Sequence, residues 1–287
     1  MTFSQLLTAA VRQKGNPVLV GLDPRFDSLP AVLRGDDVAA SFERFCYEII
    51  DVVAPLVPAV KPQAAFFEQY GPAGMVVLER VIRYARKKGL IVIFDGKRND
   101  IGSTAEAYAA GILGVDSAWG ADALTVSPYL GDDSIEPFVQ AAVKRNAGIF
   151  VLVKTSNPGS KMLQDLNAEG KTIYRRVAEY IEQLAERTEG SVGAVVGATW
   201  TEQLAELRNV MPSAWFLVPG FGSQGGSAKD VAPAFKPDGL GAIINNSRGI
   251  IFAYNKEPFK SQFGEAHWQQ AVEVATKEMI GQLTIRD

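Results

Sequence analysis

The stretch Ile91-Val92-Ile93-Phe94-Asp95-Gly96-Lys97-Arg98-Asn99-Asp100 joins four apolar residues directly to a run of alternating charges. The apolar run predicts a buried strand, and side chains two positions apart on a strand point the same way. Asp95 and Lys97 are therefore expected side by side at the C-terminal end of this strand. Burial of charge costs free energy unless the charge is paired, so this pair beside the core needs an explanation.

The chain is expected to turn soon after this strand. Ser103-Thr104-Ala105-Glu106 has the spacing of a capping box, which predicts that a helix begins there. Asp100 falls within the turn, and we expect the turn to direct it away from Asp95 and Lys97.

Short apolar runs alternate with amphipathic patterns along the whole chain. Candidate strands are residues 18–22, 59–61, 90–95, 123–126, 148–154, 193–197, 215–218 and 241–245. Helical patterns between them include residues 41–53, 73–88, 104–113, 135–146, 171–188 and 201–211. Eight strands in βα alternation predict an α/β fold, a (β/α)8 TIM barrel.

An open, doubly wound sheet is the alternative to the barrel. Its first βα turn should carry a glycine-rich fingerprint, whereas Asp23-Pro24-Arg25 follows the first strand here. No linker or change in composition divides the sequence, so we expect residues 1–287 to form a single domain.

The composition is that of a globular protein with a substantial core. Of the 287 residues 47% are hydrophobic, and the formal net charge of −3 gives no electrostatic indication of nucleic-acid binding. The single cysteine, Cys46, cannot form an internal disulfide and lies in an apolar pattern, which indicates a core position and a reducing compartment. No charged leader or membrane-length apolar span is visible, so a soluble, cytoplasmic protein without a membrane partner is expected.

Zinc and thiol chemistry are not expected. The one histidine, His267, lies in a helical stretch far from Cys46, so no cluster of His and Cys metal ligands is available. No Gly-x-Ser-x-Gly elbow is present either, and His267 is more readily explained as a surface or packing residue than as a catalytic base.

Polar residues follow the predicted strands at the end where TIM barrels carry their active sites. The first strand leads to Asp23, the second ends in Lys61, and the third carries Asp95 and Lys97. The fifth runs into Lys154-Thr155-Ser156-Asn157-Pro158-Gly159. One rim of the barrel is therefore predicted to carry a functional site.

The segments after the last two strands resemble a phosphate cradle. Pro219-Gly220-Phe221-Gly222-Ser223-Gln224-Gly225-Gly226 follows the seventh strand, and Asn246-Ser247-Arg248-Gly249 follows the eighth. Glycines allow backbone N–H groups to approach an anion closely, and TIM barrels commonly hold phosphate at this position. Arg248 supplies a fixed charge with a forked donor geometry, and Gln224 could close over the phosphate.

Lys61, Asp95, Lys97 and Asp100 could form an array of alternating charge. Such an array could brace the rim as a salt-bridge network, or one of its lysines could form a Schiff base with a carbonyl substrate. A lysine flanked by carboxylates is held as the ammonium, which favours proton donation over attack on a carbonyl.

The motif Asp95-Gly96-Lys97-Arg98-Asn99-Asp100-Ile101 is similar to the Asp-x-Lys-x-x-Asp-Ile motif of the orotidine 5′-phosphate decarboxylase family. Gly102-Ser103-Thr104-Ala105-Glu106-Ala107-Tyr108 resembles the longer bacterial (type 2) branch of that family. The likeness covers the whole chain, with Gly21-Leu22-Asp23-Pro24, Val60-Lys61-Pro62 and the late loops in the same order. Gly102 stands where shorter members often have proline, so the turn into the next helix is expected to differ.

The resemblance implies a homodimer of (β/α)8 barrels that converts orotidine 5′-phosphate to uridine 5′-phosphate and carbon dioxide without metal or cofactor, in pyrimidine biosynthesis. It implies that Lys97 donates the proton, that Lys61 and Asp95 act beside it, and that Asp100 enters from the neighbouring subunit. The resemblance further implies that Asp23 and Lys61, with Thr104 and Asp100 of the neighbouring subunit, bind the ribose of the substrate. It implies that Ser156 contacts the pyrimidine. The phosphate is expected to be held by Gln224 and Arg248, with Gly222 and Ser247 of their loops.

Three other functions share parts of this pattern. A related sugar-phosphate decarboxylase, such as a 3-keto-gulonate phosphate decarboxylase, uses the same motif with magnesium. A Schiff-base aldolase would use one of the lysines as nucleophile. A non-catalytic nucleotide-phosphate sensor would need the loops but not the full set of charges.

Overall fold

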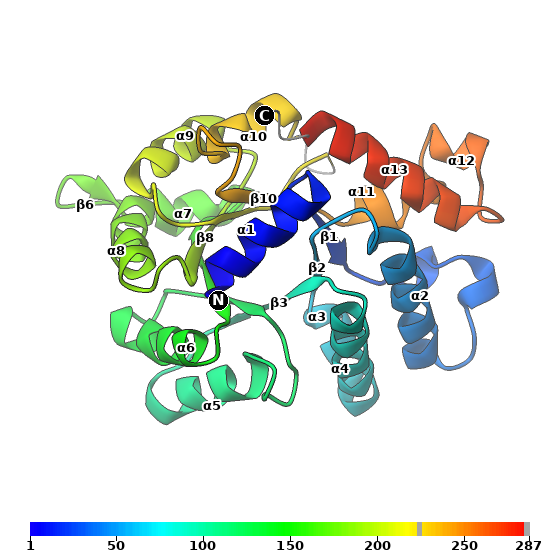
Figure 1. Ribbon diagram of the computed structural model, residues 1–287, viewed down its shortest axis with the longest axis horizontal. Helices are drawn as coiled ribbons and strands as arrows, with labels where there is room; N and C mark the ends of the chain where they lie inside the picture. The colour runs from blue at the N-terminus through cyan, green and yellow to red at the C-terminus, as the bar shows by residue number, and fades with distance from the viewer. Residues whose placement is uncertain (223–225, 284–287) are drawn as a thin grey trace.

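The structure is a computed structural model, in which residues 1–222 and 226–283 are described. Its centre is a closed barrel of eight parallel strands in the order β1-β10-β9-β8-β5-β4-β3-β2 (Figure 1). The strands are β1 (Val18–Leu22), β2 (Ala59–Pro62), β3 (Ile91–Arg98), β4 (Ala123–Val126), β5 (Gly148–Lys154), β8 (Val192–Val196), β9 (Phe216–Val218) and β10 (Ala242–Asn246). Each expected strand overlaps one of these, so the prediction of a TIM barrel is confirmed.

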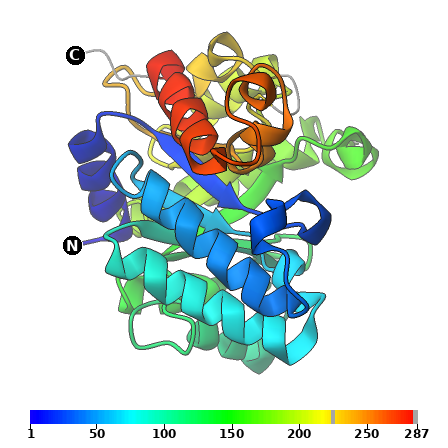
Figure 2. The same cartoon turned by 90° about the vertical axis from the view of Figure 1, so that its right-hand side faces the viewer.

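Helices surround the barrel and lie in the connections between its strands. The longer ones are α2 (Val38–Val53), α4 (Gly71–Lys87), α5 (Gly102–Ile112), α6 (Asp132–Lys144), α8 (Ile173–Arg187), α9 (Thr201–Val210) and α13 (Trp268–Leu283). Short helices lie in the connections: α3 (Ala65–Glu68), α7 (Lys161–Gln164), α10 (Ala228–Val231), α11 (Arg248–Ile251) and α12 (Phe259–Gln262). Figure 2 shows α2 and α4 running side by side, with α13 beside α2. Their apolar faces and the outward side chains of the strands form the larger hydrophobic cluster.

A second hydrophobic cluster fills the barrel itself. The side chains that β1, β2, β3, β4 and β10 contribute to it are Leu19, Ala59, Ile91, Ile93, Ala123 and Ile243. Helix α1 (Phe3–Lys14) lies across the N-terminal ends of the strands and buries Phe3, Leu7 and Val11 against this cluster (Figure 1). The ring of Phe3 meets Phe150 edge-to-face, with 5.9 Å between centroids. This end of the barrel is therefore closed, and the opposite end is left for a site.

The start of α5 differs from the prediction. The helix begins at Gly102, before the expected capping box, and no side chain caps its N-terminus. Gly102 has φ of +51°, a conformation that glycine adopts readily, and the helix begins there, two residues before the expected start at residue 104. Ser103 and Thr104 are consequently part of the first turn, and the capping-box prediction is wrong.

The connection between β5 and α8 is also more elaborate than the sequence suggested. It contains α7 and a two-stranded hairpin of β6 (Asn167–Ala168) and β7 (Lys171–Thr172).

In the described ranges no helix combines the length and apolar character needed to span a lipid bilayer.

Candidate active site

The inward side chains change from apolar to polar toward the C-terminal end of the barrel. On β2, Ala59 is followed two positions later by Lys61; on β3, Ile93 is followed by Asp95. The same change occurs on β4 and β10, where Thr125 and Asn245 follow the last apolar inward residue. Because strand side chains alternate with a period of two, each of these polar groups is directed into the barrel above the apolar layer.

These side chains line a cavity of about 500 Å³ at the open end. Polar groups at the C-terminal ends of β1, β2, β3, β4 and β10 line one part of it, and further polar groups come from the connection after β5, at Thr155, Ser156, Asn157 and Gln164. Its apolar side comes from β5, β8 and β9, through Leu152, Val195, Leu217 and Pro219. The cavity can therefore hold a ligand that has one polar and one apolar side.

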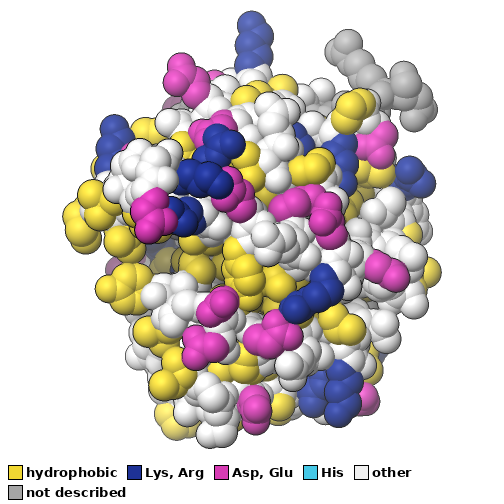
Figure 3. Space-filling model, turned by 90° about the vertical axis from the view of Figure 1, so that its left-hand side faces the viewer, with side chains coloured by type: hydrophobic (Ala, Val, Ile, Leu, Met, Phe, Trp, Pro, Cys, Tyr) yellow, Lys and Arg dark blue, Asp and Glu magenta, His cyan; other side chains and the backbone are white. Residues whose placement is uncertain are grey.

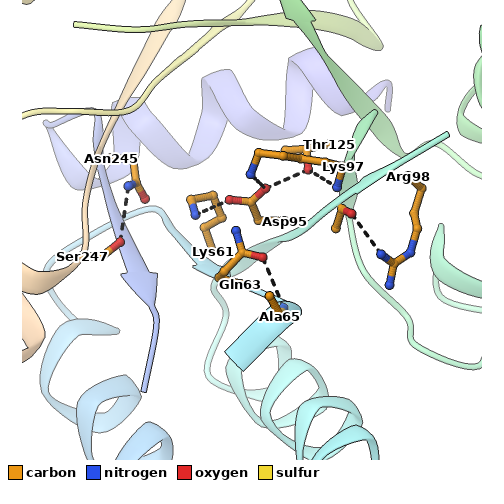
Figure 4. A network of polar contacts seen from close by, with 10 residues as sticks. Lys61, Gln63, Ala65, Asp95, Lys97, Arg98, Thr125, Asn245 and Ser247 are labelled. Carbon is orange, nitrogen blue, oxygen red and sulfur yellow. Dashed lines mark hydrogen bonds and ion pairs between the residues drawn. The ribbon is translucent and has the colours of Figure 1, made fainter. Parts of the chain in front are cut away.

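The strongest electrostatic feature of the cavity is a chain of three charges (Figure 4). Lys61 Nζ lies 2.6 Å from Asp95 Oδ2, and Lys97 Nζ lies 2.7 Å from Asp95 Oδ1. The Thr125 hydroxyl also donates to Asp95 Oδ1, at 2.9 Å. Lys61 and Asp95 are buried, whereas the Lys97 side chain is 45% exposed and faces the cavity.

This pairing sets the protonation of the buried members. Burial by itself would raise the pKa of Asp95, but the ammonium groups of Lys61 and Lys97 outweigh burial and hold that pKa well below its ordinary value. Burial would lower the pKa of Lys61, but the charges of Asp95 and Asp23 outweigh it and raise that pKa. Both groups are therefore ionised at neutral pH.

The backbone of β3 brings Lys97 to this position by leaving regular strand geometry. Lys97 has φ of +45°, and the pairing of β3 with β4 shifts register between Phe94 and Arg98. The Lys97 N–H donates to Thr125 Oγ1 at 2.9 Å. The expectation that Asp95 and Lys97 lie side by side is confirmed, but Thr125 on the next strand is part of the reason.

Asp23 and Asn245 provide acceptors that the protein leaves open. Asp23 Oδ1 and Asn245 Oδ1 are buried in the cavity lining and make no hydrogen bond within the described chain. The Asn245 amide donates to Ser247 Oγ at 3.4 Å, on the side of the site opposite Asp95 (Figure 4). Buried acceptors without partners are costly, so these two are available to donors on a bound molecule.

The predicted phosphate loops are placed unequally around the cavity. Ser247 and Arg248 line it, and the Arg248 side chain is exposed at its mouth. Gly220 also lines the cavity, whereas Gly222 lies outside this lining, exposed, with its N–H donating to the Gly226 carbonyl at 2.8 Å. Gln224 lies outside the described residues.

Ser156 lines the cavity beside the apolar wall. Asp100 and Thr104 do not lie among the lining residues. Asp100 is half-buried and accepts from the Ile101 N–H at 2.8 Å, and Thr104 is exposed on the first turn of α5. In this chain, therefore, neither residue lines the cavity.

Neither of the two residues weighed for thiol and histidine chemistry is among the residues that line the cavity. Cys46 is buried, and burial raises the pKa of its thiol. His267 is exposed. Within the described ranges no group of three or more His, Cys, Asp or Glu side chains is arranged to hold a metal ion.

Several cavity residues were not singled out from the sequence: Gln63, Thr125, Thr155, Asn157, Gln164 and Asn245. Strand parity carries a signal for Thr125 and Asn245, since each is the polar residue two positions after an inward apolar one. Gln164 lies in an irregular connection, where no periodicity indicates which way it points.

Comparison with known proteins agrees with this geometry. Residues 17–258 match the sequence profile of the family described as orotidine 5'-phosphate decarboxylase / HUMPS. The orotidine 5'-phosphate decarboxylase of Rhodopirellula baltica is 57% identical over 99% of both chains. That of Deinococcus radiodurans is 44% identical over 88% of this chain and 90% of its own.

The fold leads to the same group of proteins. A solved structure of the OMP decarboxylase of Leishmania donovani superimposes with a TM-score of 0.80 and 34% identity, covering 100% of both chains. Similarity over the whole chain, in sequence and in structure, accompanies the charged cavity. The chain therefore belongs to the orotidine 5'-phosphate decarboxylase / HUMPS family.

Proposed function

We propose that the protein decarboxylates orotidine 5′-phosphate to uridine 5′-phosphate and carbon dioxide, the last step of uridine 5′-phosphate synthesis. The observation that carries the proposal is the Lys61–Asp95–Lys97 array at the polar side of a cavity of about 500 Å³. Membership of the family and the 57% identical decarboxylase of Rhodopirellula baltica support it.

The difficulty of this reaction is the electron pair left behind. When the bond between the ring carbon and the carboxylate breaks, carbon dioxide leaves and the ring carbon becomes a carbanion. The Lys97 ammonium stabilises this charge as it develops and then transfers a proton to the carbon. Lys97 is half exposed, so it can regain a proton from solvent.

Asp95 contributes in two ways. It pairs with both ammonium groups and holds them in place before substrate arrives. It would also lie near the substrate carboxylate and repel it. Two charges about 4 Å apart interact by about 4 kcal/mol at an effective dielectric constant of about 20, whereas enzymes lower barriers by roughly 8–23 kcal/mol. Repulsion is therefore a minor contribution, and preorganised positive charge is the major one.

The two-sided cavity suits the substrate. The ribose hydroxyls would donate to Asp23, beside Lys61, and the pyrimidine would lie against the apolar wall with Ser156 at its edge. The phosphate would reach Arg248 and Ser247 at the mouth, and we expect Gly222 and Gln224, from the segment that follows β9 in the sequence, to bind it as well. Binding energy from this remote phosphate can hold the ring against the charge array. No cofactor or metal is needed for these steps.

We further propose that the protein works as a homodimer in the cytoplasm, with residues 1–287 as one domain. Asp100 and Thr104 lie outside the cavity on the surface, where they could complete the site of a second copy. Large apolar side chains are exposed nearby or on the following connections: Ile101, Tyr108, Tyr129, Leu130, Met162, Leu163 and Leu166. Figure 3 shows apolar side chains among charged ones on the face that carries α6 and α8.

Purified protein treated with a chelator and mixed with orotidine 5′-phosphate tests the proposal. The ultraviolet absorbance should change as the conjugated carboxylate is lost, and one equivalent of carbon dioxide should be released per substrate. Absence of turnover would contradict the proposal, and turnover that returns only with added magnesium would contradict the mechanism without a metal.

A further inference from the structure

In the connection after β5, two side chains hold the end of the strand and have no role in the proposed reaction; we call this pair of contacts the clamp. The chain leaves the barrel at Thr155, forms α7, and returns through the β6–β7 hairpin. Two consecutive residues at the end of α7, Gln164 and Asp165, reach back to the end of β5. They contact Thr155 and Lys154, respectively.

Gln164 makes two hydrogen bonds to one residue. Its Oε1 accepts from the Thr155 N–H at 3.0 Å, and its Nε2 donates to Thr155 Oγ1 at 2.9 Å. The remaining polar groups of Thr155 are also held by side chains. Its carbonyl accepts from Trp200 Nε1 at 2.9 Å, and its hydroxyl donates to Asn157 Oδ1 at 2.7 Å. The position of Thr155 is therefore set by side chains and not by the barrel's own strand pairing.

The ion pair between Lys154 and Asp165 holds the second residue of the clamp against the end of β5. Lys154 is completely buried, and its ammonium is paired with Asp165 and lies 5.0 Å from the centre of the Trp200 ring. A buried ammonium without a partner would be strongly destabilising, so Asp165 is tied to this position. Gln164 is adjacent in the chain and is thereby placed over Thr155.

The residue that follows Thr155 has little freedom of its own. Ser156 packs against Gly197 so closely that a Cβ at that glycine would lie 2.9 Å from the Ser156 backbone nitrogen. Thr155, Ser156 and Gln164 all line the cavity next to Leu152 of the apolar wall. The clamp therefore fixes the part of the rim that faces the proposed pyrimidine site.

We infer that Gln164 is a positioning residue for the pyrimidine, acting through Thr155 on Ser156. This inference rests on the proposed function, because it assigns Gln164 to the binding of the pyrimidine of the proposed nucleotide substrate and not of its phosphate. Gln164 holds the pyrimidine edge of the cavity, and the phosphate end at Arg248 does not depend on it.

Calorimetric titration of Gln164→Ala with uridine 5′-phosphate and with ribose 5-phosphate tests the inference. The affinity for uridine 5′-phosphate should fall by about tenfold, the size expected for one or two lost hydrogen bonds, while the affinity for ribose 5-phosphate stays unchanged. If the alanine variant folds poorly, Gln164→Leu, which keeps the volume of the side chain, replaces it. This variant should likewise lose affinity for uridine 5′-phosphate and keep its affinity for ribose 5-phosphate. Gln140→Ala, on the outer helix α6, is the matched control and should change neither affinity.

Thr155→Val and the double variant separate positioning from direct contact. If Gln164 acts through Thr155, the losses in uridine 5′-phosphate affinity should be clearly less than additive. Additive losses, unchanged affinity for uridine 5′-phosphate, or equal losses for both ligands would each overturn the inference. Turnover of orotidine 5′-phosphate by the unaltered protein reports separately on the proposed function.

Discussion

At the scale of single residues, Asp95 organises the site because groups from three strands meet on its carboxylate. Lys61, Lys97 and Thr125 contact it at 2.6, 2.7 and 2.9 Å. Strand parity in the sequence predicts Asp95 and Lys97 on one side. It cannot predict the positive φ of Lys97, because that conformation depends on a hydrogen bond to Thr125 on a neighbouring strand.

Asp95→Asn should destabilise the fold. The substitution leaves the buried Lys61 ammonium without its closest partner, and breaking a buried pair in this way costs about 3 kcal/mol. Urea unfolding at pH 7 measures the difference from the unaltered protein. A change of less than about 0.5 kcal/mol, which is the range of ordinary surface substitutions, would contradict the pairing.

The difference in unfolding free energy between Asp95→Asn and the unaltered protein should also depend on pH in a defined way. The folded-state pKa of Asp95 lies below the unfolded value of about 3.9, so its stabilisation is present above that pH and is lost as the pH falls toward the folded-state pKa. The difference in unfolding free energy between the two proteins should therefore be constant from about pH 5 to pH 8 and narrow below about pH 4. A difference that grows on acidification would refute the assignment.

At the scale of elements, the site depends on the close approach of β1 to the end of β10. A Cβ at Gly21 would lie 1.8 Å from Ser247 Oγ, so only glycine leaves room for that hydroxyl. The sequence predicted both strands and the Ser247-Arg248 segment. It could not predict this contact, because Gly21 and Ser247 come together only when the barrel closes.

Gly21→Ala should displace Ser247 and Arg248 and weaken phosphate binding. We expect the affinity for ribose 5-phosphate to fall by about tenfold or more, which corresponds to at least about 1.4 kcal/mol. Gly111→Ala on α5 is the control, since a Cβ there meets nothing within 4 Å. Equal affinities for both variants would show that Ser247 does not hold the phosphate.

The irregular connections were the least predictable elements. The capping box expected at Ser103 does not form, since Gly102 starts α5 earlier. Similarly, the β6–β7 hairpin and the Gln164 clamp were not expected. Each strand of the hairpin has only two residues, too few for a periodic pattern, and the clamp is held by single side-chain contacts with Thr155 and Lys154.

At the scale of the whole molecule, the barrel separates stability from function. Helix α1 and the apolar layer close one end, and the polar layer at the other end carries the site. This division could be predicted from the sequence, because apolar strands with polar C-terminal residues recur along the chain. The proposed pairing of subunits could not, since an interface between copies leaves no periodic signal in the sequence.

Mixing two inactive variants tests the proposed shared site. Lys97→Ala and Asp100→Ala should each be inactive, but subunits exchanged between them should form mixed dimers in which one of two sites is intact. With equal subunits and random pairing, about a quarter of the original specific activity should return. No recovery, with exchange verified by mass spectrometry, would show that Asp100 does not serve a second copy.

The most direct test of the account is the turnover number of Lys97→Ala with orotidine 5′-phosphate, measured by ultraviolet absorbance. Because Lys97 is half exposed, its removal should leave the free energy of unfolding within about 1 kcal/mol. Turnover should nevertheless fall by at least about 10³-fold, since both charge stabilisation and proton donation are lost. Lys87→Ala on α4 should turn over normally. Near-normal turnover of Lys97→Ala would contradict the assignment of the proton donor and with it the central claim.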